Sequence, residues 1–218
     1  ISAFELMHRA GLEFLSETLP DIRQPFAEPP EWFVLIDVGL ARGLDPAAAL
    51  ETLFAEAFEA GLVSDGMIAS SEAQRHAFWE VREQIPEANR RIGSVSSHDI
   101  SLPLGAIPDF IARAPGILGR IGTFRINCFG HLGDGNLHFA GWPSNDDPGM
   151  HKAIKEAVDD EVIRLGGSIS AEHGIGLAKR PAMGRYKDGA ALVAMRAIKR
   201  ALDPNGIMNP GKLVPPRR

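Results

Sequence analysis

The sequence predicts an α+β fold in which helices pack on one face of an antiparallel sheet. Two observations point to this class. Short runs of β-branched and aromatic residues alternate with segments whose apolar residues recur at helical spacing. Over residues 98–172 these segments follow the order strand, helix, strand, strand, helix, strand, which is that of a ferredoxin-like sheet. An earlier strand, helix, strand pattern over residues 32–70 extends the same sheet, and helices follow at the C-terminus.

The first thirty residues are predicted to form a helix and a linker outside an α+β core of residues 31–175. Apolar residues at helical spacing begin at Ala3 and continue to Phe14. The segment from Pro20 to Pro30 then holds four prolines, which fix φ and lack a backbone donor, so we expect an irregular connector.

The elements of the first half have clear boundaries in the sequence. A β-branched and aromatic run over residues 32–38 predicts a buried strand. Asp45 caps the next helix, which Gly61 ends, and residues 66–70 follow as a short strand. Ser71 begins a further helix, because the glutamine three residues later completes a capping box.

The second half repeats this alternation and ends in a different kind of segment. The predicted elements are a strand at 98–104, a helix at 107–117, strands at 123–129 and 136–142, a helix at 147–165 and a strand at 168–172. Residues 176–218 contain a helix followed by many turn formers, so this segment is expected to lie on something outside the core.

Composition and charge exclude several classes of function. The chain has 218 residues, of which 44% are hydrophobic and 23% charged, enough for one packed core. The net charge of −5 argues against binding to nucleic acid or to an anionic membrane. The single cysteine, Cys128, is expected in the core, and no apolar run of about eighteen residues predicts a transmembrane segment. We therefore expect a cytoplasmic protein whose partners are small molecules and proteins.

Two histidines flank the glycine-rich turn of "CFGHLGDGNLHF", residues 128–139. If Asp134 and Gly135 form a two-residue type I′ turn, His131 pairs with His138 across the hairpin. Directly opposed side chains share a face, with Cβ atoms about 4.5–5.5 Å apart, so both imidazoles can reach one metal ion. The alternative is that both histidines face solvent and the glycines serve the turn alone.

The segment "SISAEHGIG", residues 168–176, adds a carboxylate and a further histidine. A predicted strand delivers Glu172 and His173 beside the strand that carries His138. Two imidazoles and one carboxylate leave an open position on a divalent metal, so His131, His138 and Glu172 are the predicted ligands. His173 is either a general base, since the ordinary pKa of histidine lies near neutral pH, or a hydrogen-bonded structural residue.

Arg82 lies in a predicted helix that also carries Phe78 and Trp79. One interpretation is a surface arginine. The other is a clamp for the carboxylate of a substrate, because the guanidinium group can bind a carboxylate through two hydrogen bonds.

Three motifs, in this order and spacing, resemble the C-terminal half of FAD-linked oxidases and dehydrogenases of the vanillyl-alcohol oxidase type. They are "GHLGDGNLHF" at residues 130–139, "SAEHGIG" at 170–176 and "LDPNGIMNPGKL" at 202–213. The resemblance covers nearly the whole chain and is closest to the D-lactate and D-2-hydroxyglutarate dehydrogenases.

The resemblance implies that this chain is the substrate- and metal-binding half of an FAD-dependent D-2-hydroxy acid dehydrogenase. The metal, zinc or a similar divalent ion, would be held by the three ligands named above. His173 would take the proton of the substrate hydroxyl while a hydride passes to FAD. Arg82 matches the family's arginine for the substrate carboxylate, and Asn136 is implied as a second substrate-binding residue.

The resemblance also implies partners for the chain. An N-terminal FAD-binding domain would hold most of the flavin, and residues 176–218 would return to it. Glu172, His173, Asn209 and Lys212 would approach the cofactor from this chain. The remaining partners would be a small 2-hydroxy acid and an electron acceptor, and a homodimer is left open.

Three positions differ from the D-2-hydroxyglutarate pattern. Pro86, Ser97 and Ala140 stand where that branch has threonine, lysine and asparagine. These changes remove donors to the substrate carboxylates, so the particular 2-hydroxy acid stays open. A chain that works without an FAD-binding half would instead be a metal-dependent hydrolase or a non-catalytic binding module of the same fold.

Overall fold

The computed structural model describes residues 1–39, 42–43, 45–93, 96–143 and 148–215. The strands are β1 (Ala3–His8), β2 (Trp32–Asp37), β3 (Ser96–Ser101), β4 (Phe124–His131) and β5 (Asn136–Pro143). The α-helices are α1 (Arg9–Thr18), α2 (Pro46–Glu59), α3 (Glu72–Ile92), α4 (Ile107–Gly119), α5 (Pro148–Arg164), α6 (Arg180–Tyr186) and α7 (Gly189–Leu202). Short 3₁₀ turns are η1 (Leu104–Ala106) and η2 (Leu132–Asp134).

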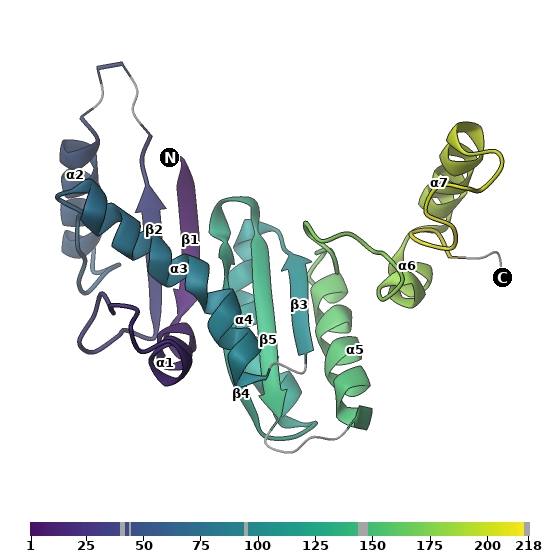
Figure 1. The fold of residues 1–218 in the computed structure, drawn as a ribbon, viewed down its shortest axis with the longest axis horizontal. Helices are drawn as coiled ribbons and strands as arrows, with labels where there is room; N and C mark the ends of the chain where they lie inside the picture. Colours follow the sequence, from purple (N-terminus) through teal and green to yellow (C-terminus); the bar gives the residue numbers. More distant parts are fainter. Residues whose placement is uncertain (40–41, 44, 94–95, 144–147, 216–218) are drawn as a thin grey trace.

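The strands form one antiparallel sheet in the order β2-β1-β4-β5-β3 (Figure 1). The portion β3-β5-β4, with α4 and α5 in its connections, is the ferredoxin-like core, so the predicted α+β class is confirmed. Residues 168–172 do not form the predicted last strand. Only a single bridge remains there, in which Ser168 pairs with Ser101 at the free edge of β3.

The N-terminal segment is a strand where the sequence predicts a helix. Residues 3–8 form β1, which pairs with β2 on one side and β4 on the other, and α1 begins only at Arg9. The apolar spacing of so short a segment is compatible with a helix or a strand. The segment forms a strand because it can then make main-chain hydrogen bonds to a neighbour on each side. The unit that extends the sheet is therefore β1-α1-β2, and residues 66–70 form no strand.

Helices cover both faces of the sheet, whereas the sequence predicts one (Figure 1). On the first face Phe110 of α4 packs against Phe139, with ring centroids 5.2 Å apart. On the opposite face Phe14 of α1 packs against Trp142, with centroids 4.7 Å apart, and α3 lies beside it. Phe139 and Trp142 lie three residues apart on β5 and so point to opposite faces. The one-face prediction holds for α4 and α5 only.

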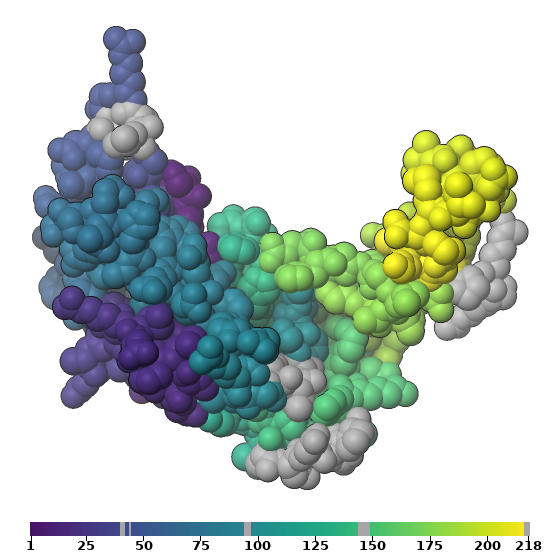
Figure 2. All heavy atoms as spheres, in the orientation of Figure 1, coloured from purple at the N-terminus to yellow at the C-terminus, as the bar shows by residue number. Residues whose placement is uncertain are grey.

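The helices α6 and α7, with the residues around them from 176 to 215, form an arm beyond the edge of the sheet (Figure 1). Arg185 and Tyr186 of α6 both donate to the Asp160 carboxylate on α5. The outer helix α7 leaves Val193 and Ile198 largely exposed. A hollow separates this arm from the part of the chain that holds α2 (Figure 2).

Candidate functional site

The sheet register gathers polar side chains on the face that α1 and α3 partly cover. Glu5 of β1 lies directly opposite His131 of β4. His138 of β5 lies opposite Phe129 on one side and opposite Asp99 of β3 on the other. Because opposed residues share a face and alternate residues return to it, all of these side chains project toward the same side of the sheet.

The hairpin between β4 and β5 is longer than predicted. The 3₁₀ turn over residues 132–134 precedes Gly135, and His138 pairs with Phe129 instead of His131. The predicted two-residue type I′ turn is therefore wrong. Within the longer connection, the side chain of Asp134 accepts a hydrogen bond from the backbone N–H of Asn136. The two imidazoles still lie on one face as diagonal neighbours, with ring centroids 5.9 Å apart.

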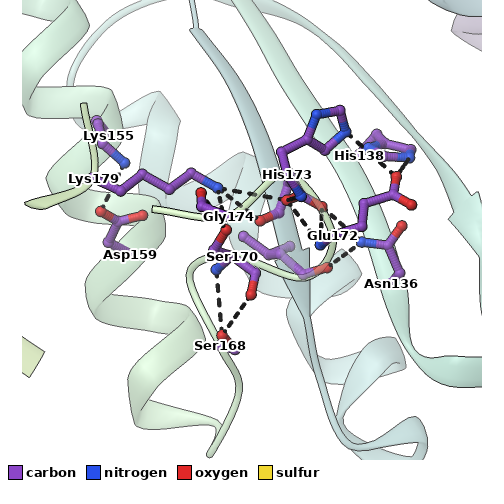
Figure 3. A network of polar contacts seen from close by, with 12 residues as sticks. Asn136, His138, Lys155, Asp159, Ser168, Ser170, Glu172, His173, Gly174 and Lys179 are labelled. Atoms are coloured by element: carbon purple, nitrogen blue, oxygen red, sulfur yellow. Dashed lines mark hydrogen bonds and ion pairs between the residues drawn. The ribbon is translucent and has the colours of Figure 1, made fainter. Parts of the chain in front are cut away.

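Glu172 and His173 lie in a loop and not on a strand, so strand alternation does not separate their side chains. Both point toward His138 (Figure 3). The Oε1 atom of Glu172 is 3.3 Å from Nε2 of His138 and 3.4 Å from Nε2 of His173. The loop thus brings one carboxylate between two imidazoles.

Asp99 holds this loop against the sheet. Its Oδ2 atom accepts hydrogen bonds from the backbone N–H of Glu172 at 3.2 Å and of His173 at 2.9 Å. Its Oδ1 atom accepts from Nδ2 of Asn136 at 3.0 Å. Burial would raise the pKa of Asp99, but these hydrogen bonds, together with the nearby Lys179, hold it below its ordinary value. A buried carboxylate therefore fixes the main chain that carries the two site residues.

Electrostatics favour the neutral form of His138. Burial first, and then the positive charge of Arg82, lower the pKa of His138 from its ordinary value. A neutral imidazole is the form that binds a metal.

The residues that could hold a metal form one compact group. Among the described residues, Asp99, His138, Glu172 and His173 offer ligand atoms that all lie within 4.8 Å of one another. His131 is outside this group, although its ring lies next to that of His138. The oxygens of Asp99 already accept hydrogen bonds from the loop and from Asn136, which makes Asp99 the least available ligand of the four.

Arg82 is buried, with 6% of its surface exposed, so it is not the surface arginine that one interpretation of the sequence allowed. Its Nε donates to Glu5 at 2.8 Å, and its guanidinium carbon lies 4.8 Å from the centre of the Phe129 ring. Among the described residues, its two terminal NH₂ groups make no hydrogen bond. They are free to bind a carboxylate.

The other predicted site residues have different surroundings. Nδ2 of Asn136 donates to Asp99 and to the carbonyl of Ile100, while its Oδ1 is buried without a hydrogen-bond partner among the described residues. Asn209 and Lys212 are exposed in the arm, and among the described residues no hydrogen bond or ion pair joins either of them to Glu172 or His173. Their predicted approach to a flavin stays a prediction.

Two residues of the site, Glu5 and Asp99, were not predicted from the sequence. Asp99 is the one acidic residue of the strand predicted at 98–104, and a charged residue inside a strand is a signal that could have been used. Glu5 gave no comparable signal, because the segment was predicted as a helix, where one face is expected to be polar.

Comparison with known proteins identifies the family of this chain and a solved structure with the same fold. Residues 1–213 match the family described as FAD linked oxidases, C-terminal domain. The chain belongs to this family. A 4-ethylphenol oxidase from Gulosibacter chungangensis has the same fold, with a TM-score of 0.52 at 15% sequence identity over 99% of this chain and 48% of that one.

Curated relatives of this FAD-linked oxidase domain are named D-2-hydroxyglutarate dehydrogenases. Those from Arabidopsis thaliana and from Xanthomonas citri pv. viticola are each 34% identical to it, over 215 and 219 residues. The alignments cover 99% and 98% of this chain but 38% and 46% of the relatives. The chain thus spans less than half the length of these relatives.

The predicted cytoplasmic location is wrong. The relatives from Arabidopsis thaliana and Bos taurus are named as mitochondrial proteins. The prediction was based on the net charge and the single cysteine. These features are compatible with a reducing environment, but they do not identify the cellular compartment. No helix in the described ranges is long and apolar enough to cross a membrane.

Proposed function

We propose that this domain is the substrate- and metal-binding part of an FAD-dependent D-2-hydroxy acid dehydrogenase, which oxidises a 2-hydroxy acid to a 2-oxo acid. The observation that carries the proposal is the grouping of His138, Glu172 and His173 on the face of the sheet where Arg82 contacts Phe129 and lowers the pKa of His138. Such a site offers metal ligands, a proton acceptor and a carboxylate clamp side by side. Membership of the FAD-linked oxidase family supports the same reaction class.

The donor set fits a divalent metal such as zinc. His131, His138 and Glu172 would hold it through two imidazole nitrogens and one carboxylate oxygen. Two observations favour this set: the pKa of His138 is lowered, and Nδ1 of His131 is occupied by Glu5, so Nε2 is the nitrogen left for a ligand. When bound, the metal would act as a Lewis acid that makes the substrate hydroxyl more acidic.

The residues of this chain would bind the acid and move its proton. The terminal NH₂ groups of Arg82 would pair with the substrate carboxylate. His173, whose side chain is 65% exposed, would take the hydroxyl proton. The α-carbon would lose its hydrogen with both electrons to FAD as the carbonyl forms, so one proton and one hydride leave the substrate together.

The departures from the D-2-hydroxyglutarate pattern lie beside this site. Ser97 and Ala140 are directly opposed on β3 and β5. Ser97 lies two residues before Asp99 and Ala140 two residues after His138, so this pair shares the face of the Asp99–His138 pair. Neither side chain carries a charge that could pair with a second carboxylate. We therefore expect a monocarboxylic D-2-hydroxy acid, of the D-lactate type, to be used at least as well as D-2-hydroxyglutarate.

The same proposal includes a second domain. FAD would be bound mainly by an FAD-binding domain, and the arm with its exposed Val193 and Ile198 would pack on that domain. Asn209 and Lys212 in the arm would then lie near the cofactor. An electron acceptor would reoxidise the flavin.

The test is anaerobic reduction of the flavin in the full-length protein by a panel of D- and L-2-hydroxy acids, before and after chelation. We expect a D-acid to bleach the flavin, with the bleaching lost on chelation and restored by zinc. If no 2-hydroxy acid reduces the flavin, the proposed reaction is wrong. If reduction survives complete removal of the metal, the reaction stands and the metal site does not.

A further inference from the structure

Glu5 is a buried carboxylate with two different partners. Only 3% of its surface is exposed, and it lies on β1, an interior strand that pairs with β2 and β4. Its Oε2 accepts from Nε of Arg82 at 2.8 Å, and its Oε1 accepts from Nδ1 of His131 at 2.8 Å. One carboxylate therefore joins the predicted clamp to a predicted metal ligand.

The contact with His131 determines which ring nitrogen carries the proton. A carboxylate can only accept, so Nδ1 of His131 must be the protonated nitrogen of the neutral ring. The lone pair then lies on Nε2, which makes no hydrogen bond among the described residues. A carboxylate behind a histidine in this way orients the ring and prepares its other nitrogen to bind a metal.

The contact with Arg82 holds a buried cation in one orientation. Arg82 has a single ion-pair partner among the described residues, and that partner is Glu5. A buried cation that lost its partner would be strongly destabilising. Because Glu5 engages only Nε, the two NH₂ groups at the end of the guanidinium fork stay available for a carboxylate ligand.

We infer that Glu5 is a positioning residue that sets the tautomer of His131 and at the same time orients Arg82. The inference rests on the proposed function for its consequence, since the metal would bind the hydroxyl end of the acid and Arg82 its carboxylate end. Both groups are fixed to the same carboxylate, so their separation is fixed too. Loss of Glu5 would disturb metal binding and acid binding together.

The informative variant is Glu5→Gln, which keeps the shape of the side chain. A glutamine can accept from Arg82 only by turning its NH₂ group toward His131. That NH₂ group requires Nδ1 of His131 to accept, which moves the ring proton to Nε2 and blocks the metal-binding nitrogen. Glu13→Gln is the matched control, because Glu13 is exposed on α1.

The measurement is the nitrogen NMR spectrum of full-length protein labelled with ¹⁵N in histidine, recorded without metal, followed by calorimetric zinc titration. In the wild-type protein and in Glu13→Gln we expect His131 protonated at Nδ1. In Glu5→Gln we expect the proton at Nε2 and zinc binding weakened about 10–100-fold. An unchanged tautomer in Glu5→Gln would overturn the inference.

The tautomer readout separates this inference from the proposed function. If the wild-type protein binds no zinc, the metal site of the proposed function fails, and the proton position in Glu5→Gln still decides the role of Glu5. If Glu5→Gln does not fold, the wild-type spectrum decides: a proton on Nδ1 of His131 supports the inference, and a proton on Nε2 contradicts it.

Discussion

Asp99 shows how a single buried carboxylate can position the residues of a candidate site through their main chain. It binds two consecutive backbone N–H groups of the loop, those of Glu172 and His173. Its main-chain carbonyl also accepts from Nζ of Lys179. Lys179 in turn donates to Oγ of Ser170 (Figure 3). The loop that carries Glu172 and His173 is therefore attached to β3 at several points, and Asp99 supplies most of them.

Replacement of Asp99 by asparagine is expected to loosen this loop. Asp99→Asn keeps the volume but turns one acceptor oxygen into an NH₂ donor. In either orientation of the amide this donor faces other donors, either the N–H groups of Glu172 and His173 or Nδ2 of Asn136. Loss of hydrogen bonds to a charged group costs about 1.5–3 kcal/mol, so amide hydrogen exchange at these two residues should accelerate by about tenfold or more. The control is Asp109→Asn, an exposed acid in the first turn of α4. Exchange that is unchanged in Asp99→Asn would show that the main-chain contacts alone hold the loop.

The residues that could be predicted from the sequence are those with reactive side chains at motif spacing. His138, Glu172 and His173 were predicted to lie together, and the structure places them in contact. Glu5 and Asp99 could not be identified in that way, because a carboxylate that holds another group is recognised only by its partner. Those partners are 126 and 73 residues away along the chain for the pairs Glu5–His131 and Asp99–Glu172.

At the scale of elements, the turn between β4 and β5 depends on Gly135. This residue adopts a φ of +79°, and an added Cβ would overlap the carbonyl oxygen of Leu102. The backbone N–H of Leu102 also donates to the carbonyl of Gly135 at 3.0 Å, so the turn is attached to the segment after β3. Gly135 thus helps to shape the hairpin that carries both histidines, as does Gly130, where an added Cβ would overlap the carbonyl oxygen of Asn136.

Gly135→Ala is expected to destabilise the fold by about 2–5 kcal/mol. The left-handed conformation costs about 1–2 kcal/mol for a residue with a Cβ, and the steric overlap adds about 1–3 kcal/mol. Gly133→Ala in the same turn is the control, because an added Cβ there meets no atom within 4 Å. Urea unfolding of both variants measures the difference. Equal loss of stability in the two variants would contradict the assigned role of Gly135.

A second element-level prediction concerns Glu161, which joins α4 to α5. Its buried carboxylate accepts from Arg164 on its own helix and from Arg113 on α4. The pKa of Glu161 is lowered to about 2, mainly by the hydrogen bonds from Arg164. Burial opposes this effect, and the hydrogen bond from Arg113 adds to it. An unfolded glutamate has a pKa of about 4.3.

The sign of the pH effect follows from this difference. Because the folded pKa is the lower one, the stabilisation by Glu161 is complete above about pH 4.5 and is lost as the pH falls toward 2. Both arginines are about half exposed, so after allowance for solvent screening we expect about 1–2 kcal/mol. Unfolding free energies measured from pH 5 to 2.5 should therefore fall less steeply in Glu161→Gln than in the wild type. Glu156→Gln, on the exposed side of α5, should follow the wild-type curve.

The elements that were predicted wrongly share one physical cause. The segment at residues 3–8 and the segment at 168–172 are short, and their apolar spacing is compatible with several structures. The secondary structure of such segments depends on which strands lie next to them. β1 pairs with a strand on each side, whereas residues 168–172 lie at the edge of the sheet and form a single bridge. Longer amphipathic segments such as α5 bury enough apolar surface to form as predicted.

At the scale of the whole molecule, the sheet and its two helical layers are separate in their packing from α7 and the tail, whereas α6 packs Ala182 and Tyr186 against the cluster that α4 and α5 cover. Both apolar clusters are built from β1, β4 and β5 together with α1, α3, α4 and α5. The arm has one buried residue in α7, Leu192, and its tail folds back on α6, where Pro215 lies against Gly184. The stability of the sheet and the attachment of a second domain can therefore be tested separately.

Deletion of residues 188–218, which removes α7 and the tail, is expected to leave the thermal midpoint of the remaining chain within about 4 °C of the original. A change of that size corresponds to about 1 kcal/mol for a domain of this length. Deletion of residues 1–8 should instead abolish cooperative unfolding, because β1 supplies two hydrogen-bond ladders and places Leu6 and Met7 in opposite clusters. Calorimetry of the two truncated chains gives both results. If the first deletion unfolds the sheet, the arm is part of the core and not a segment available to pack on an FAD-binding domain. If the second leaves a cooperative transition, β1 does not have the central place in the sheet that its pairing indicates.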